Sequence, residues 1–140
     1  MAHPRMYQDN DFGLAELRAL ALSFPAAIEK EAFGRPTFRA GEKGKIFSYF
    51  GQGQSGRPRP FSVLVLVEGS ERDALLQDPR CYLPSYLASA GWIGLDLTAA
   101  TPDWQEIAEL LDSSYRRVAS KSLLARLDTE GGPADRRTDD

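Results

Sequence analysis

The sequence holds few of the side chains from which catalytic and metal sites are most often built. Among its 140 residues, His3 is the one histidine and Cys81 the one cysteine. A single cysteine excludes an intrachain disulfide, and so few imidazole and thiol groups argue against a transition-metal centre. His3 falls in a terminal segment where no positioned imidazole is expected, and Cys81 is interpreted as a small buried hydrophobe. We therefore predict no enzymatic activity, no cofactor and no metal.

Long hydrophobic runs are also missing. The longest, at residues 61–67 (FSVLVLV), has the length of a strand, whereas a helix that spans a bilayer needs about 20 apolar residues. The N-terminal residues carry no apolar stretch of the length typical of a secretory signal. These observations predict a cytoplasmic protein that does not contact membranes.

An excess of positive charge is lacking overall but present locally. The formal net charge is −3, which argues against a generally basic surface for nucleic acid. Counted from Lys, Arg, Asp and Glu, residues 30–60 carry a local charge of +5 and residues 61–112 a local charge of −7. The cations of the first stretch could bind phosphate, pair with the acidic stretch, or only keep the hairpins soluble.

The order of helix, strand and turn signals predicts one α+β domain over residues 11–127. Residues 1–10 are expected to be a flexible N-terminus, and residues 128–140 a disordered tail because they lack apolar side chains that could offset the entropy of ordering. Apolar spacing predicts helices at residues 14–24, 70–76 and 102–118, the last with Thr101 as its cap and Pro102 at its first position, and strands at 37–39, 45–50, 61–67 and 92–97. Because consecutive strands are close enough for hairpins, we expect an antiparallel sheet packed against helices.

Residues 51–56 (GQGQSG) contain a G-x-G-x-x-G pattern. In a dinucleotide-binding fold, these glycines open a helix whose N-terminal N–H groups hold the pyrophosphate. Here R-P-R-P and then a strand follow, so no helix N-terminus is expected. Residues 51–60 are therefore interpreted as a loop at the tip of a hairpin, not as a phosphate cradle.

Six cations surround the two predicted hairpin loops. If the strands bring them to one edge of the sheet, they could contact a phosphate backbone together with interleaved aromatic side chains. The candidate nucleic-acid contacts are Arg35, Arg39, Lys43, Lys45, Arg57 and Arg59. An acidic protein partner is another use of the same edge.

A second candidate site lies later in the chain. Asp96 alternates with Ile93, Leu95 and Leu97, so it is expected to point away from their buried face, to solvent or into a polar groove. The residues that could form such a groove are Tyr82, Tyr86, Trp92 and Asp96. The alternative function is therefore a small-molecule or peptide-binding protein, including an enzyme of unrecognised activity.

Several separated blocks occur in an order that resembles the MmcQ/YjbR-like family of small bacterial proteins. They are a helix ending in S-F-P, F-G-R-P-T-F-R at residues 33–39, G-K-I-F at 44–47, G-W-I-G-L-D-L at 91–97 and S-Y-R-R-V-A at 114–119. The resemblance covers residues 14–124, which is most of the expected domain. It implies a CyaY-like α+β fold in which a curved antiparallel sheet packs against helices.

Members of this family are commonly named DNA-binding because of a proposed double-wing arrangement, and they have no established reaction as a class. The resemblance implies DNA as the ligand of the basic hairpins, and so modest a basic patch predicts weak, salt-dependent binding. Phe33, Phe38 and Trp92 lie in the matching blocks and are interpreted as core residues, while Gly34 and Pro36 set the entry to a strand.

Overall fold

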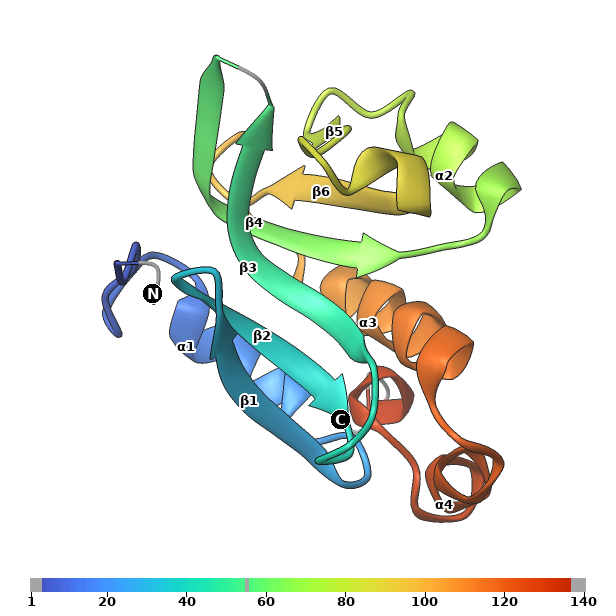
Figure 1. Cartoon of the computed structure of the whole chain (residues 1–140). Helices are drawn as coiled ribbons and strands as arrows, with labels where there is room; N and C mark the ends of the chain where they lie inside the picture. The colour runs from blue at the N-terminus through green and yellow to red at the C-terminus, as the bar shows by residue number, and fades with distance from the viewer. Residues whose placement is uncertain (1–3, 55, 137–140) are drawn as a thin grey trace.

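The structure, a computed structural model, describes residues 4–54 and 56–136 (Figure 1). The helices are α1 (Leu14–Ala21), α2 (Gly69–Leu75), α3 (Trp104–Val118) and α4 (Lys121–Glu130), with short 3-10 helices η1 (Ala88–Ala90) and η2 (Pro133–Arg136). The strands are β1 (Ala27–Ala32), β2 (Arg35–Ala40), β3 (Ile46–Gln54), β4 (Arg57–Leu66), β5 (Cys81–Tyr82) and β6 (Trp92–Asp96). No helix among these residues is long and apolar enough to cross a membrane.

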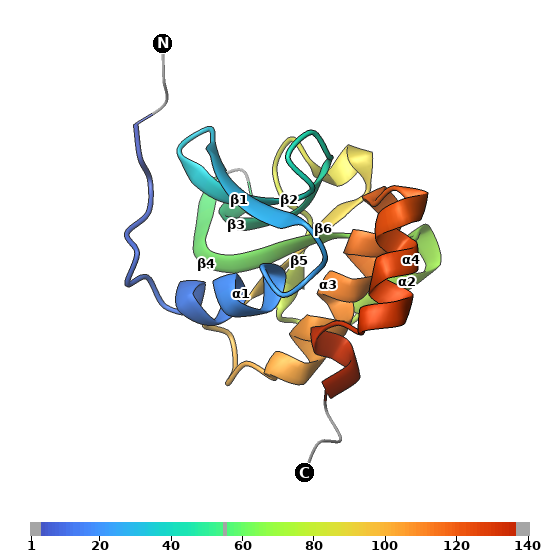
Figure 2. The same cartoon turned by 90° about the horizontal axis from the view of Figure 1, so that it is seen from below.

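The strands form one antiparallel sheet in the order β1-β2-β3-β4-β6-β5. Helices α1 and α3 lie on one side of it, which Figure 2 shows from below. Because neighbouring residues of a strand point to opposite faces, the pairing of Phe38 with Ser48 and of Ser48 with Val65 defines the face toward these helices. The pairing of Thr37 with Tyr49 defines the other face. The predicted α+β class, an antiparallel sheet packed against helices, is confirmed.

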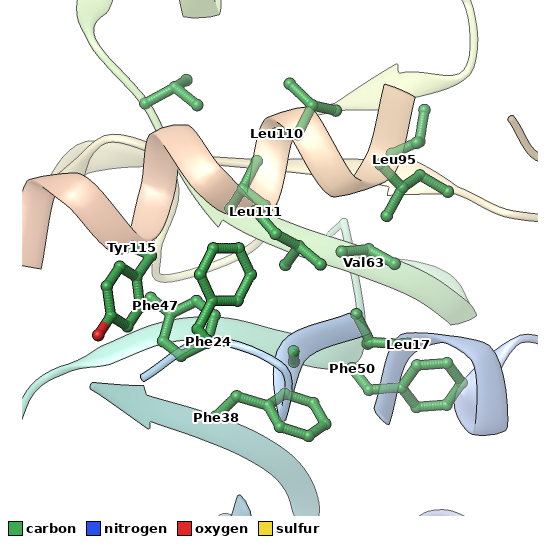
Figure 3. Packing of buried hydrophobic residues seen from close by; sticks show 14 of the residues in the cluster. Leu17, Phe24, Phe38, Phe47, Phe50, Val63, Leu95, Leu110, Leu111 and Tyr115 are labelled. Carbon is green, nitrogen blue, oxygen red and sulfur yellow. The ribbon is translucent and has the colours of Figure 1, made fainter. Parts of the chain in front are cut away.

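The main core lies between the sheet and the helices α1 and α3 (Figure 3). The rings of Phe24 and Tyr115 stack with centroids 4.8 Å apart, and Phe47 meets them edge-on at 5.5 and 5.2 Å. The Tyr115 hydroxyl donates to the Pro25 carbonyl oxygen over 2.7 Å. Aromatic packing thus joins the end of α3 to the segment that follows α1.

Helix α3 also docks on the sheet through a buried hydroxyl. Ser114 Oγ accepts a hydrogen bond from the Leu66 N–H over 2.8 Å and donates one to the Phe47 carbonyl oxygen over 2.5 Å. At the other end of the helix, the side chain of Asp103 accepts from two backbone N–H groups of the first turn. The helix therefore begins two residues later than predicted, because the Asp103 carboxylate, and not Thr101, serves as the cap.

Strand β1 was not predicted. Its sequence, AIEKEA, carries three charged residues and little apolar alternation, because β1 is an edge strand that pairs with β2 alone. Charged side chains are common on edge strands, where they oppose pairing with other chains. Ala32 pairs with Arg35, so Phe33 and Gly34 form a two-residue turn, and their φ values of 53° and 80° suit the tight turn of a hairpin.

The predicted loop at residues 51–60 is wrong. Strand β3 continues through Gln54 and β4 begins at Arg57, with Gln52 paired to Arg59. The register shifts between Phe50 and Gln52, which bends the hairpin. Prolines 58 and 60 are tolerated because pairing of β4 with β6 begins only at Ser62, so this part of β4 has an open edge.

The terminal segments differ from the prediction as well. Helix α4 extends through Glu130 and η2 follows, where the expected tail should be disordered. Gly132 packs against Leu127 and Phe24, a tertiary contact that no local pattern indicates. Residues 4–10 lie against the β1–β2 turn, where the Met6 N–H donates to the Gly34 carbonyl oxygen over 2.8 Å. Residues 1–3 and 137–140 of the two predicted segments lie outside the described residues.

Candidate functional site: a groove on the open face of the sheet

The face of the sheet away from α1 and α3 carries a small core of its own. Leu64, Tyr82 and Trp92 are buried there, and Tyr49 and Leu87 pack against them. The rings of Tyr49 and Trp92 meet edge-on with centroids 4.9 Å apart. The Ser85 N–H donates to the Gly53 carbonyl oxygen over 2.8 Å, which ties the segment between β5 and β6 to β3. This segment forms a wall beside Tyr49.

A cavity of about 530 Å³ lies between this wall, β3 and the β1–β2 turn. Its volume falls in the range of roughly 300–1,000 Å³ that small-molecule sites occupy. Most of the lining side chains are apolar or aromatic, and Arg35 and Gln52 are the longer polar ones. The apolar and aromatic walls include Met6, Phe33, Tyr49, Tyr86 and Leu87.

Arg35 lines this first cavity with a half-buried guanidinium. Within residues 4–54 and 56–136, the side chain of Arg35 makes no hydrogen bond or ion pair. Burial lowers the pKa of Arg35 from its usual value, and the electrostatic attraction of Tyr82 and Asp11 does not outweigh this effect. The group stays protonated at neutral pH, since arginine has a pKa above 12 in solution. A buried cation without a counter-ion is costly, so an anion that enters the cavity gains a strong interaction.

Gly51 makes room for this guanidinium. A Cβ atom at Gly51 would lie 2.7 Å from Arg35 Nη1 and 2.9 Å from the Pro60 carbonyl oxygen, and the residue has a φ of 80°. Only glycine fits both the approach and the backbone conformation. The first glycine of the G-x-G-x-x-G pattern therefore positions Arg35.

A second cavity of about 340 Å³ continues from the first toward the tip of the β3–β4 hairpin. Arg35, Gln52 and Tyr86 line both cavities, so the two form one elongated depression, here called the groove. The walls of the second cavity are more polar. They include Gly53, Gln54, Arg57 and Ser85.

Two exposed aromatic side chains stand at the groove in an unusual backbone conformation. Phe33 is 71% exposed with a φ of 53°, and Tyr86 is 96% exposed with a φ of 67°. Non-glycine residues rarely adopt positive φ, and bulky ones do so at an energetic cost. The prediction that Phe33 is a core residue is wrong, because Phe33 occupies the β1–β2 turn; Phe38 and Trp92 are buried as predicted.

An ion pair lies below the groove. Arg59 Nη1 donates to Asp96 Oδ2 over 2.9 Å, and the two side chains are 11% and 14% exposed. The Arg59 guanidinium also lies over the Tyr82 ring, 4.9 Å from its centroid. Burial opposes ionisation of Asp96, but hydrogen bonds from Thr98 and Arg59 outweigh it and lower the pKa of the carboxyl group. Burial raises the pKa of Tyr82 to about 12.

The six candidate cations do not converge on one edge. Arg59 is bound to Asp96, and Arg39 is partly buried with its Nη1 donating to the Gly44 carbonyl oxygen over 3.4 Å. Lys43 and Lys45 are exposed in the β2–β3 turn. Arg57, the first residue of β4, pairs with Gln54 at the other end of β3 and is exposed. Nine residues of strand separate these ends, or roughly 25–30 Å at the usual rise.

The second predicted site is brought together only in part. Tyr82 and Trp92 are buried, and Asp96 is paired with Arg59 and lines neither cavity. Of the four predicted groove residues, Tyr86 alone lines the two cavities described above. The sequence analysis missed Met6, Tyr49, Gly51 and Gln52, whose convergence depends on the strand pairing.

The structure also shows the environment of the single cysteine and the grouping of potential metal ligands. Cys81 packs against the main core, and burial raises the pKa of its thiol to about 11, so the thiol is protonated at neutral pH. No group of three or more His, Cys, Asp or Glu side chains in the described part of the chain could hold a metal ion.

Comparison with known proteins gives the family. The model of the YjbR family matches residues 22–117, which include every predicted site residue and most of the groove. The chain belongs to the YjbR family. A crystal structure of protein DR2400 from Deinococcus radiodurans, whose domain is assigned to DUF419, is similar with a TM-score of 0.63 and 21% identity, over 86% of this chain and 89% of that one. No curated protein matches the sequence.

This YjbR-family assignment confirms the resemblance noted in the sequence. The similarity to DR2400 supports the fold, since 21% identity is too low to carry a function. Met6, which lines the first cavity, lies outside the range of the family match. The groove is therefore built mainly from the family domain, with one wall added by the N-terminal segment.

Proposed function

We propose that this chain is a binding protein, not an enzyme, and that its groove takes an anionic ligand with an apolar or aromatic part. The observation that carries the proposal is the half-buried Arg35 guanidinium, which lines a 530 Å³ cavity without a hydrogen bond or ion pair among the described residues. The anion pairs with Arg35, and the apolar part packs against Tyr49, Phe33 and Leu87.

Isothermal titration calorimetry with 1-naphthyl phosphate tests this proposal, with 1-naphthol and inorganic phosphate as controls for the apolar and anionic parts. We expect 1-naphthyl phosphate to bind more tightly than either control. Arg35→Met keeps the apolar stem and removes the charge, so it should weaken binding at least about tenfold, the effect of losing one charged hydrogen bond.

Arg117→Met is the matched control, because Arg117 is exposed in the last turn of α3, on the far side of the sheet. It should bind like the wild type. The Arg35→Met protein should melt at or above the wild-type temperature, since the substitution removes a half-buried charge. Equal affinity in wild type and Arg35→Met, or no heat with 1-naphthyl phosphate at millimolar concentration, rejects the proposal.

Duplex DNA is a second candidate ligand, favoured by the exposed cations Lys43, Lys45 and Arg57 at the two ends of β3. These three could contact phosphates at the two ends of the strand, whereas Arg59 is paired with Asp96 and Arg39 is partly buried. Binding of a labelled 20-bp duplex, followed by anisotropy, should then weaken steeply between low and physiological salt. No binding at low salt, or no loss in a Lys43→Ala/Lys45→Ala/Arg57→Ala protein, contradicts this candidate. An acidic protein would use the same three cations.

A further inference from the structure

We propose that the groove recognises a nucleoside 5′-phosphate group, presented either by a free nucleotide or by the terminal nucleotide of a single strand. This inference rests on the proposed function, because the same groove and the same Arg35 receive the ligand. It adds a role for each cavity: the first takes the base and the second takes the phosphate.

The first cavity suits a planar heteroaromatic ring. Three aromatic side chains line this cavity: those of Phe33, Tyr49 and Tyr86. Stacking on such side chains accepts any base, because every base has a π face. The rings of Tyr49 and Trp92 pack edge to face, so the Tyr49 ring is held in position before a ligand enters. Pre-set aromatic walls lower the entropy that binding costs.

The second cavity suits a phosphate. Arg35 stands at the junction of the two cavities, and Arg57 lines the second one together with Gln52 and Ser85. A terminal phosphate carries between one and two negative charges near pH 7, and arginine forks match its oxygens in pairs. Two arginines at one cavity therefore favour a phosphate over a single carboxylate.

The three glycines of the G-x-G-x-x-G pattern line the groove. Gly51 lines the first cavity, and Gly53 and Gly56 line the second. At Gly53, a Cβ atom would lie 2.8 Å from the Arg57 carbonyl oxygen, so the two hairpin strands approach closely there. The glycines thus shape the floor of the groove, where no helix N-terminus is involved.

The polar edges of a base also find partners in the groove. The amide of Gln52 and the hydroxyl groups of Tyr49 and Tyr86, which line the first cavity, can each donate and accept hydrogen bonds. A base within a duplex is stacked on both sides and paired along its edge, so it cannot enter a concave site of this size. The geometry accordingly favours an unpaired nucleotide.

Calorimetric titration of the full chain with AMP, CMP, GMP and UMP tests the assignment, with adenosine, ribose 5-phosphate and 1-naphthyl phosphate alongside. We expect each mononucleotide to bind at least about tenfold more tightly than adenosine or ribose 5-phosphate. Arg57→Met should weaken AMP binding at least about fivefold and leave adenosine unchanged. Arg117→Met should change neither.

The stacking role has its own matched pair of variants. Tyr86→Asn removes the ring and keeps a residue that tolerates positive φ, so it should weaken AMP binding about tenfold. Ala26→Asn introduces the same side chain at another exposed residue with a positive φ (58°) outside both cavities, and should bind AMP like the wild type. Equal affinity of Tyr86→Asn and wild type for AMP overturns the assignment of the base to the first cavity.

The source of the nucleotide is decided by three further ligands: hexathymidylate with a 5′-phosphate, the same strand with a 5′-hydroxyl, and a blunt 20-bp duplex. Tighter binding of the phosphorylated strand than of TMP identifies a strand end, and equal or weaker binding identifies the free nucleotide. If 1-naphthyl phosphate binds through Arg35 while no mononucleotide binds more tightly than ribose 5-phosphate, the inference fails and the proposed function stands. If neither class binds, both fail.

Discussion

Gly51 links the backbone of one strand to the charge in the groove. Its φ of 80° accompanies the register shift of β3, and its missing side chain leaves space for Arg35 Nη1. Gly56, in the same sequence pattern, has a φ of 74° but no atom within 4 Å of the position of a Cβ. Both glycines thus have a positive φ, but only at Gly51 would a Cβ atom lie too close to neighbouring atoms.

Alanine substitutions at these two glycines separate the two effects. Gly56→Ala should cost about 1 kcal/mol of unfolding free energy, from backbone strain alone. Gly51→Ala should cost at least ~1 kcal/mol more, because the methyl group also displaces Arg35 or the Pro60 carbonyl. Urea denaturation measures both values. Equal losses of unfolding free energy in the two variants would show that the position of the Arg35 side chain does not depend on the absence of a side chain at Gly51.

At the scale of elements, the segment before β5 is attached to α3 by Arg80. Arg80 Nη2 lies 2.6 Å from Asp78 Oδ2, and Arg80 Nη1 lies 3.1 Å from Glu106 Oε1 on α3. The side-chain hydrogen bond from Arg80, followed by the bond from its backbone N–H, lowers the pKa of Asp78 to about 2. This contact fixes one end of the chain that continues into the groove wall.

The lowered pKa of Asp78 predicts a defined dependence of stability on pH. The unfolded carboxyl group has a pKa near 4, so its folded-state contribution is complete above that value and is lost as pH falls from about 4 to about 2. The difference in unfolding free energy between wild type and Asp78→Asn should therefore be constant at pH 5–7 and shrink toward pH 2. Denaturation in urea at several pH values measures it.

Arg80→Met provides the check on this mechanism. Because it removes the side-chain donor and keeps the backbone N–H of residue 80, the Arg80→Met protein should show a dependence between pH 4 and pH 2 that is shallower than that of the wild type and steeper than that of Asp78→Asn. A dependence as steep as that of the wild type would mean that another group causes the acid sensitivity.

At the scale of the whole molecule, the two faces of the sheet have different roles. Its helix-facing side carries the large core around Phe47, and its other side carries the groove above the small core of Leu64, Tyr82 and Trp92. Strands β3 and β4 contribute to both. The groove can therefore vary in its exposed residues while the main core holds the strands in place.

Phe47→Ala tests how far the molecule depends on the main core. Phe47 is fully buried and contacts the rings of Phe24 and Tyr115, so its truncation should cost about 3–5 kcal/mol. Phe12→Ala, at a residue that is 50% exposed, should cost less than about 1 kcal/mol. Thermal and urea unfolding compare the two, and similar losses would place the main source of stability elsewhere.

Elements with strong local patterns were predictable. The face of α3 that carries Ile107, Leu111 and Tyr115 and the alternation of Ile93, Leu95 and Leu97 identified a helix and a strand, because burial on one face imposes a regular spacing. Edge strand β1 and the paired residues 51–54 were missed, since charged residues and glycines match loops as well as edge strands.

The candidate site was predictable only as a pool of residues. Arg35, Arg57 and Tyr86 were selected for their charge or aromatic character, but so were Arg59 and Arg39, which the structure engages inside the protein. Charge is a property of the residue, whereas burial and pairing depend on which strand lies next to it.

The sequence by itself determined the family, the α+β class, the main helix and the stretch in which the cations gather, because periodic apolar spacing and local turn chemistry act over a few residues. Only the tertiary structure decided which cations are available. Pairing between strands distant in the chain joined Arg59 to Asp96 and left the Arg35 guanidinium, beside Gly51, without an ion pair among the described residues. Contacts between segments so far apart depend on the registration of the whole sheet, which no short stretch of residues encodes.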